Sequence, residues 1–370
     1  MQWCHISFIL VLSLIVVDFS SGLSVNSYHE ESKEDFAKTL LSVIAFFRHG
    51  ERIPDKMTDY PANPYKNYSY FPYELGDLTR KGQKTMIELG LLLKKRYKAF
   101  LGDRYFGGLI SSTSSSYIRC QMSLQALHAG LFWTNNWNAV EGLPWQPIPY
   151  QTLPINNDYV SIFKTCPSVL TNITIPELDM ETQEVFDYLK QHSGYDEIDY
   201  MRALTIFDHT KTNLEVGLDP PDWLKKIYPE PLKSVGMKFW KLVIDQKQRI
   251  GAGPLLQRIV QHAELSNQGV SITKMFLYAG HDITIHFLLN ALNSWKSEIV
   301  EYGALLLFEL HKIHDTVGFK VFFRNNAGGL EDGAIYIPNC GLFCPLKQFI
   351  KLVEHTYNPT LSKNITLAVY

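Results

Sequence analysis

The sequence has little excess charge of either sign. Its 35 lysines and arginines nearly balance 37 aspartates and glutamates, which gives a formal net charge of -2. Proteins that bind a nucleic-acid backbone or an anionic membrane usually carry a basic surplus. We therefore expect neither nucleic acid nor a membrane surface as a partner. With 46% hydrophobic residues the chain is not disordered, and it can form one large domain or two moderate ones.

Several common catalytic motifs are also missing. The chain has no glycine-rich phosphate loop ending in Lys-Ser/Thr, no Gly-X-Ser-X-Gly elbow and no His-Glu-X-X-His motif. It contains neither an internal repeat nor a low-complexity tract. Any phosphate or zinc chemistry must therefore rest on a different set of residues.

Long hydrophobic runs are scarce, and the one near the N-terminus covers residues 6–17. It is too short to span a bilayer comfortably, and small polar residues follow it at 20–22, which is typical of a secretory signal peptide. We assign residues 1–22 to this signal, with an uncleaved anchor as the alternative. We expect the mature protein to be secreted, or to lie in the lysosomal lumen. Three Asn-X-Ser/Thr sites are then predicted glycan acceptors: Asn67, Asn172 and Asn364.

Cysteine is rare, with five in the chain, and Cys4 would leave with the signal peptide. The remaining even number suits an oxidising compartment. Cys340 and Cys344 flank a glycine, and prolines lie on both sides, so we predict a tight loop closed by a disulfide. A zinc site is excluded because no second cysteine or histidine pair lies nearby at ligand spacing. Whether Cys120 and Cys166 pair is left open.

Two short apolar runs, at residues 41–47 and 275–280, have the composition of strands buried on both faces. The first ends abruptly at Arg48 and the second at His281. A shorter strand at 108–111 leads into a serine- and threonine-rich run. Ligands of an α/β sheet bind beyond the carboxyl ends of its strands. We therefore expect the polar residues after these three strands to share one edge.

Helical patterns lie between these strands. Residues 79–100 have a capping Thr79 and apolar positions three or four apart, and a second helix begins near Tyr117 and turns Ile118 inward. A third helix follows Asp282, and further strands are expected at 304–310 and 319–323. Residues 133–221 differ, with connections rich in Trp, Asn and Pro and mixed helical stretches, which we interpret as a helical cap.

The segment Arg48-His49-Gly50-Glu51-Arg52 has the composition of an anion site with a nucleophile inside it. Guanidinium groups bind phosphate oxygens bidentately, and Arg119 would supply a third. Nearby positive charge disfavours imidazolium, so His49 can stay neutral and attack. A surface loop that merely turns at Gly50 is the alternative interpretation of the tripeptide alone.

The pair His281-Asp282 supplies what the first segment lacks. Asp282 is a candidate proton donor for the leaving oxygen, and His281 is a further phosphate ligand. Alone, the pair could cap a helix, and Arg119 alone could be a solvated residue. The arginines and His281 stabilise the charge that a metal stabilises in other phosphatases, so we expect no metal or cofactor.

Other charged residues have plainer interpretations. Glu51 and Asp55 are better explained by a solvated loop or a contact to a neighbouring arginine than by a paired-carboxylate site. The remaining histidines show no ligand spacing, and we take five of them as core or surface residues: His128, His209, His286, His311 and His314.

The full Arg48 to Pro54 block, the Leu78-Thr79-Arg80-Lys81-Gly82 helix entry and Gly280-His281-Asp282 resemble the histidine acid phosphatases, with insect venom enzymes as the nearest type. The resemblance implies His49 as nucleophile and Asp282 as proton donor. It implies four phosphate ligands: Arg48, Arg52, Arg119 and His281. It also implies an α/β fold with a mixed central sheet flanked by helices and a smaller inserted, mostly helical domain. We place the catalytic domain at 39–135 and 240–350, the cap at 136–239 and a C-terminal tail at 351–370.

The expected function is hydrolysis of small phosphate monoesters through a phosphohistidine. One alternative is a phytase or inositol polyphosphate phosphatase, which should line its pocket with extra lysine and arginine. Another is a catalytically inactive secreted binding protein, although such a protein tends to lose the nucleophile or the donor. Whether two copies associate as a homodimer is left open.

Overall fold

The computed structural model describes residues 33–134, 140–162, 166, 169–296, 298–325 and 333–357. The predicted signal peptide (1–22), the acceptor Asn364 and residues 358–370 of the predicted tail lie outside them. Within the described ranges, no helix has both the length and the apolar character needed to cross a membrane.

One mixed sheet has the strand order β3-β2-β4-β1-β5-β6-β7. Strands β3, β2, β4 and β1 are parallel to one another. The pairs β1–β5, β5–β6 and β6–β7 are antiparallel. The predicted mixed α/β sheet is confirmed. The strand bounds are β1 Leu40–Arg48, β2 Ile110–Ser114, β3 Gln151–Thr152, β4 Met275–Gly280, β5 Leu305–Ile313, β6 Thr316–Arg324 and β7 Cys344–Pro345.

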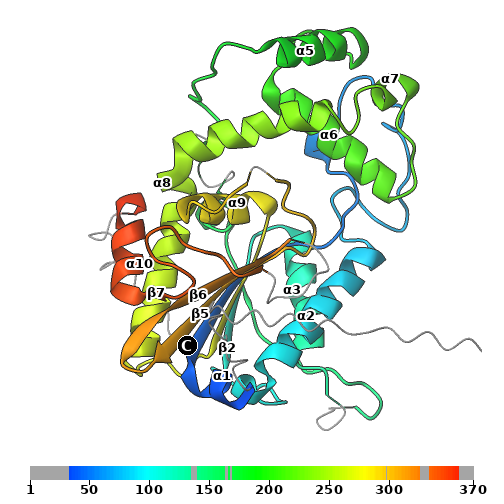
Figure 1. Ribbon diagram of the computed structural model, residues 1–370. Coiled ribbons are helices and arrows are strands. Elements are labelled where there is room, and N and C mark those ends of the chain that lie inside the picture. Colours follow the sequence, from blue (N-terminus) through cyan, green and yellow to red (C-terminus); the bar gives the residue numbers. More distant parts are fainter. Residues whose placement is uncertain are drawn as a thin grey trace, which may run out of the picture. The chain divides into compact units, whose positions relative to one another are not determined.

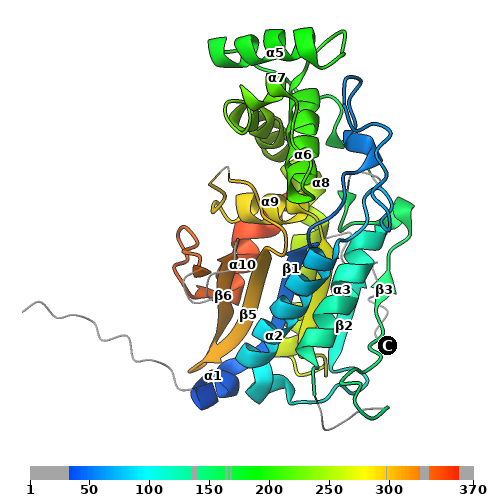
Figure 2. The same cartoon turned by 90° about the vertical axis from the view of Figure 1, so that its right-hand side faces the viewer.

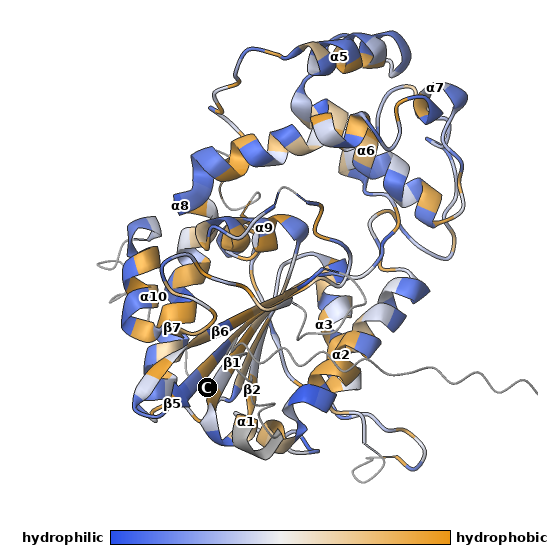
Figure 3. Cartoon of the chain, viewed as in Figure 1, coloured by the Kyte–Doolittle hydropathy of each residue, from blue (hydrophilic) through white to orange (hydrophobic). Residues whose placement is uncertain are grey.

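Strand β1 is buried on both faces, as its apolar run predicts. Ile44 and Phe46 belong to one hydrophobic cluster, whereas Val43, Ala45 and Phe47 belong to the cluster on the opposite face. All five are at most 1% exposed. Alternate side chains of a strand point to opposite faces, so a strand between two cores needs apolar residues at every position. Figure 3 shows the strands of the sheet as mainly hydrophobic.

Helices α2 and α3 cover one face of the sheet, and α9, α10 and the second half of α8 cover the other (Figure 1, Figure 2). Thr79 caps α2, as predicted, by accepting a hydrogen bond from the Gly82 N–H. The helix bounds are α1 Lys33–Thr39, α2 Arg80–Leu101, α3 Ile118–Leu131, α5 Met180–His192, α6 Tyr200–Glu215, α7 Asp222–Lys225, α8 Leu232–Asn267, α9 Asp282–Ala291 and α10 Leu346–Val353, with 3-10 turns η1 Lys56–Thr58, η2 Ile155–Asn157 and η5 Glu354–Thr356.

Helices α5, α6 and α7 and the first half of α8 lie beyond the carboxyl ends of the parallel strands (Figure 1, Figure 2). Helix α8 runs from there to the sheet as two helical segments joined by a kink at Lys247, and Pro254 lies in the second segment. It therefore crosses the predicted boundary between residues 239 and 240. The division into cap and catalytic domain stays a prediction.

The chain before α2 also packs against α6. The Tyr70 hydroxyl donates to Asn213 Oδ1 at 2.8 Å, and Asn63 Nδ2 lies 3.0 Å from His209 Nε2. Both views place this N-terminal segment beside α6 and α7. The predicted cap, residues 136–239, does not include it, because nothing in its local sequence marks contact with a helix more than 130 residues away.

One predicted core position is wrong. Ile118 is 65% exposed, whereas Cys120, Leu124 and Leu131 of the same helix are buried. Residues two apart on a helix point about 200° away from each other. Ile118 therefore faces outward once Cys120 faces the sheet.

Strand β2, predicted at residues 108–111, extends further along the chain than predicted. It continues through Ser114, because Ser112, Thr113 and Ser114 pair with β4. The Ser112 hydroxyl lies 2.9 Å from His128 Nε2, so this buried polar side chain has a partner.

Cys340 and Cys344 are joined by a disulfide in the loop before α10. Cys120 is a buried thiol on α3, and its Sγ lies 3.4 Å from the Gly280 carbonyl oxygen at the end of β4. Burial raises the pKa of this thiol to about 12, so it stays protonated and unreactive.

Candidate active site

The loop that follows β1 is held by the strands on both sides of it. The Arg48 N–H donates to the Ala304 carbonyl at 3.0 Å, and the His49 N–H donates to the Gly280 carbonyl at 3.1 Å. The Gly303 N–H donates to the His49 carbonyl at 3.2 Å. His49 is therefore fixed where β1, β4 and the chain entering β5 meet.

Two glycines bring this loop against the start of α2. A Cβ on Gly50 would lie 2.5 Å from the Gly82 carbonyl oxygen, and a Cβ on Gly82 would lie 2.2 Å from the Glu51 carbonyl oxygen. Both distances are far below a normal contact, so each position needs glycine. The predicted loop and the predicted helix entry thus form one unit.

His49 has the form that nucleophilic attack requires. Its Nδ1 lies 2.8 Å from the Gly50 carbonyl oxygen, which can only accept, so Nδ1 carries the proton. Its Nε2 accepts from Arg119 Nε at 3.2 Å. Burial and the charges of Arg119 and Arg48 hold the pKa of His49 well below its usual 6.5. The ring is therefore neutral, with its Nε2 lone pair on the side of the arginines.

Arg48 is nearly fully buried beside His49. It donates to the Val300 carbonyl at 2.6 Å and forms an ion pair with Asp282 at 3.2 Å. Its guanidinium carbon lies 4.2 Å from the centre of the Tyr302 ring, a cation–π contact. Three different contacts thus fix the orientation of this guanidinium before any ligand binds.

The other two arginines are each held by a carboxylate. Arg52 Nη2 lies 2.7 Å from Asp208 Oδ2, and Arg119 Nη1 lies 3.1 Å from Asp55 Oδ2. Arg119 also packs its guanidinium 4.4 Å from the centre of the Tyr117 ring. Paired guanidiniums keep donors available, because each carries five N–H groups.

Two buried donors of this cluster have no partner among the described residues. These are the Nε atoms of Arg48 and Arg52. An unpaired buried donor costs stability, and such groups concentrate at ligand sites. The cluster is therefore suited to an anion with several acceptor oxygens, such as a phosphate group.

His281 is oriented by a hydrogen-bond chain from another part of the sequence. The Ser115 hydroxyl donates to Asp158 Oδ2 at 2.8 Å, and its oxygen lies 3.2 Å from His281 Nε2. Because the hydroxyl proton goes to Asp158, the serine oxygen accepts from the His281 Nε2–H. Burial and the Arg119 charge hold the pKa of His281 well below 6.5. The His49 and His281 rings lie 5.4 Å apart, centre to centre.

Asp282 begins α9, directly after β4. Burial alone would raise the pKa of this carboxyl, but the Arg48 charge, together with His286, His281 and the Ile283 N–H, outweighs that effect and lowers the pKa to about 2. Asp282 is therefore ionised in the ligand-free site. It can donate a proton only after a bound anion has offset the charge of Arg48.

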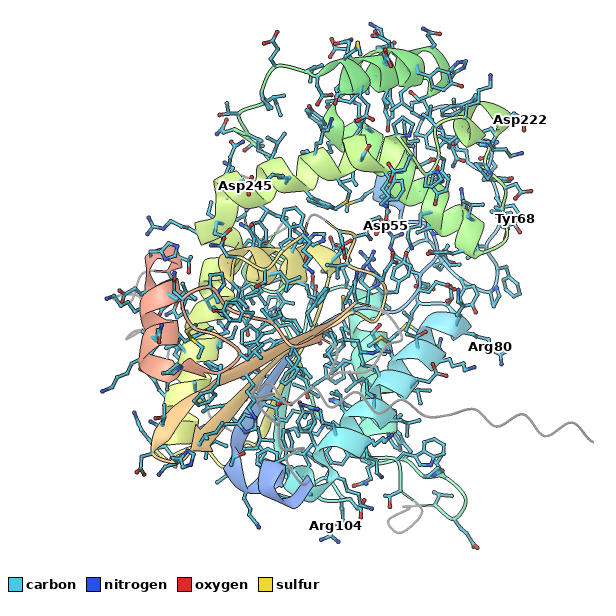
Figure 4. All side chains as sticks on the ribbon, in the orientation of Figure 1. Asp55, Tyr68, Arg80, Arg104, Asp222 and Asp245 are labelled. Carbon is cyan, nitrogen blue, oxygen red and sulfur yellow. A yellow bond between two sulfur atoms is a disulfide. The ribbon has the colours of Figure 1, made fainter. Side chains whose placement is uncertain are left out.

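These side chains border one cavity of about 370 Å³, which lies between the carboxyl edge of the sheet and helices α6 and α8. Five of the six predicted catalytic and phosphate-binding residues line it: Arg48, Arg52, Arg119, His281 and Asp282. The sixth, His49, is not among the lining residues, but it is hydrogen-bonded to Arg119, which is. In Figure 4 the labelled Asp55 lies between the sheet edge and the helices beyond it, and Asp55 also lines the cavity.

Several contributors to the site were not found from the sequence. Asp208 and Tyr302 contact predicted ligands, and Asp158 acts on His281 through Ser115. All three lie far from the motifs in the chain, and each is a common residue in an unremarkable context. Asp55 was expected in a solvated loop or beside an arginine, and it pairs with Arg119.

One histidine has a different place from the one expected. His286, taken as an ordinary core or surface residue, is 1% exposed and lines the cavity one turn after Asp282. Its Nε2 lies 3.2 Å from the Glu298 carbonyl oxygen. The signal was present in the sequence, because residues four apart share one face of a helix.

Residues 39–161 match the model of the histidine phosphatase superfamily (branch 2). The chain is 30% identical to the venom acid phosphatase Acph-1 of Apis mellifera over 334 residues, which covers 85% of each protein. It is also 30% identical to the lysosomal acid phosphatase of Homo sapiens, over 86% of this chain and 78% of that protein. The resemblance seen in the motifs is confirmed.

Solved structures show a similar fold. A Hafnia alvei phytase in complex with myo-inositol hexakis sulphate aligns with a TM-score of 0.65 and 19% identity, over 87% of this chain and 98% of that one. A multiple inositol polyphosphate phosphatase of Bifidobacterium longum aligns with a TM-score of 0.54 and 12% identity, over 86% and 93%. At these identities the likeness concerns the fold.

Proposed function

Since this chain belongs to branch 2 of the histidine phosphatase superfamily, we propose that it is an acid phosphatase which hydrolyses phosphate monoesters through a phosphohistidine on His49. The observation that carries the proposal is the neutral His49 ring, whose unprotonated Nε2 lies 3.2 Å from Arg119 Nε and whose pKa is lowered by burial and by the charges of Arg119, Arg48 and Arg52. The curated relatives, from bee venom to human lysosomes, are acid phosphatases.

In the first step the Nε2 lone pair of His49 attacks phosphorus, and the bond from phosphorus to the leaving oxygen breaks. Asp282 gives its proton to that oxygen, so the product leaves as an alcohol. In the second step water attacks the phosphohistidine and gives a proton to the Asp282 carboxylate. Inorganic phosphate and neutral His49 are released. Asp282 takes up a proton from solvent when the substrate binds and returns it to solvent when phosphate leaves, which restores the ligand-free site.

The surrounding charges favour the transition state. Arg48, Arg52, Arg119 and His281 would hold the phosphoryl oxygens, on which charge is concentrated during transfer. Their positions are set in advance by Asp282, Asp208, Asp55 and Ser115, so little reorganisation accompanies the reaction. The bound phosphate would also weaken the pull of Arg48 on Asp282 and raise its pKa into a useful range.

The phytase alternative receives less support. Among the described residues that line the cavity, Lys211 is the one cation outside the three-arginine cluster, and it already forms ion pairs with Glu215 and Glu301. A site for many phosphates needs more uncommitted positive charge. The inactive-protein alternative is disfavoured by the presence of both His49 and Asp282.

We further propose that the protein is secreted, with residues 1–22 as its signal peptide. The acceptors Asn67 and Asn172 are exposed, as glycan attachment requires. The lysosomal lumen is the alternative location. A distinct cap of residues 136–239 is part of the proposal, and association into a homodimer is left open.

The direct test is phosphate release from a simple aryl phosphate at acidic pH, with and without a strong chelator. We expect full activity in the chelator, because the three arginines supply the stabilising charge. A strict requirement for an added divalent metal would contradict the proposal.

The pH dependence follows from the pKa shifts. The attacking form of His49 is the neutral one, which exists above its pKa, and that pKa lies well below 6.5. We therefore expect no loss of kcat/KM as the pH falls from about 7 to about 5, where an ordinary imidazole becomes protonated. Above about pH 6 it should decline, since Asp282 must carry a proton and the substrate loses its second one. A pH–rate profile that falls below pH 6.5 would contradict this assignment.

A further inference from the structure

The cavity has two unlike ends. Toward the sheet it is bordered by Arg48, Arg52 and Arg119, which we assign to the phosphate group. Toward α6 and α8 it is bordered by side chains that no step of the proposed mechanism uses. A monoester has two corresponding parts, the phosphoryl group and the alcohol that leaves, so this second end faces the leaving alcohol.

The second end is apolar, and its wall comes from two helices. Phe207 on α6 and Met237 and Phe239 on α8 are 5%, 8% and 6% exposed, so they are fixed parts of the hydrophobic interior. Trp240 lines the cavity beside them, and Met201 stands at its opening, 48% exposed. Figure 3 shows hydrophobic residues along α6 and the first half of α8.

The charged residues of the cavity disfavour an anionic leaving group, and the apolar wall disfavours a polyhydroxylated one. Asp55 and Asp208 line the cavity, and each already forms an ion pair with an arginine of the cluster. Lys211 is satisfied by Glu215 and Glu301. A second phosphate would therefore meet carboxylates rather than uncommitted cations, and a sugar would leave its hydroxyls against apolar carbon.

We propose that the preferred substrates are phosphate monoesters of uncharged, apolar alcohols, whose carbon chain lies against Phe207, Met237, Phe239 and Trp240. The proposal rests on the phosphatase activity argued above. Methionine suits such a wall, because its unbranched side chain adapts to ligands of different shape. The cavity volume of about 370 Å³ is within the usual range for a small-molecule site.

The test is kcat/KM for a series of n-alkyl phosphates from ethyl to octyl, at one acidic pH and below the micelle concentration. All members have nearly the same leaving-group chemistry, so differences in kcat/KM report contact between the protein and the alkyl chain of the substrate. We expect kcat/KM to rise about threefold for each added methylene up to hexyl, and glycerol 2-phosphate and glucose 6-phosphate to fall below butyl phosphate.

Two matched variants locate the effect. Met201→Gln changes the opening of the cavity without adding charge, and the exposure of this residue makes misfolding a small risk. We expect the ratio of kcat/KM for octyl over ethyl phosphate to fall about fivefold. Met180→Gln is the control, because Met180 on α5 is 78% exposed and does not line the cavity, and it should keep the original ratio.

The outcomes separate this inference from the proposed function. Equal kcat/KM for ethyl and octyl phosphate, with both turned over, would overturn the apolar-alcohol proposal and leave the phosphatase standing. Turnover of neither, and of no aryl phosphate, would overturn both. If kcat/KM rose along the alkyl series but the octyl to ethyl ratio of kcat/KM were unchanged in Met201→Gln, the placement of the alkyl chain along this wall would be contradicted.

Discussion

Replacement of His49 by alanine is expected to lower kcat for any monoester by at least about 10⁴-fold, the scale seen when an enzyme loses its nucleophile. The reason is that His49 Nε2 is the atom that would form the bond to phosphorus, and the neutral ring it needs is created by burial and by Arg119. The measurement is kcat, together with trapping of the phosphoenzyme. Rapid alkaline quenching of the wild type with radiolabelled substrate should retain label on protein, because phosphohistidine is acid-labile, and His49→Ala should retain none.

A matched control is His355→Ala. His355 is exposed in the turn after α10 and does not line the cavity, so both kcat and labelling should match the wild type. Circular dichroism would show that His49→Ala is folded. If that variant kept substantial turnover or still accumulated acid-labile label, another residue would be the nucleophile and the mechanism would be wrong.

The second large effect is expected for Asp282→Asn, and it should depend on the leaving group. With an alkyl phosphate, whose alkoxide is a poor leaving group, kcat/KM should fall about 10²–10⁴-fold, the usual contribution of a general acid. With 4-nitrophenyl phosphate, whose leaving group needs no proton, kcat/KM should fall less than about tenfold. A loss of Arg48 alignment would slow both substrates alike, so the difference between them isolates proton donation from the ion pair with Arg48.

Asp245→Asn and Asp222→Asn are suitable controls. Both carboxylates are exposed, Asp222 on α7 and Asp245 on α8, and lie away from Asp55, as Figure 4 shows. Each should leave both substrates unaffected. If Asp282→Asn slowed alkyl and nitrophenyl phosphates by the same factor, Asp282 would act through Arg48 and would not be the acid.

The elements that carry the site were predictable because their signals are local. A strand buried on both faces must be apolar throughout, which identified β1 and β4, and the abrupt polar residues after each strand located one shared edge. Thr79 and Gly82 indicated a capped helix start. The same local reasoning failed for Ile118, since an apolar residue in the first turn of a helix does not reveal which way that turn faces.

The residues that support the site were not predictable in this way. Asp208 holds Arg52 across a separation of 156 residues, and Asp158 holds Ser115 across 43. Each pairing depends on how distant segments pack. The sequence around an isolated aspartate does not indicate which residue it will contact. Tyr302 is similar, since its ring contacts Arg48 only because the chain entering β5 lies beside the end of β1.

The ion pair between Arg52 and Asp208 joins the chemistry of the sheet edge to the helix that carries part of the apolar wall. Catalysis and substrate choice are thereby assigned to different stretches of sequence that meet at one contact. Such an arrangement allows relatives to diversify their substrates by drift in the α6 and α8 sequences while the reaction centre stays intact. In an engineered chimaera with a foreign α6, the new helix would therefore need a carboxylate at position 208. Without it, Arg52 would lose the ion pair that fixes its orientation.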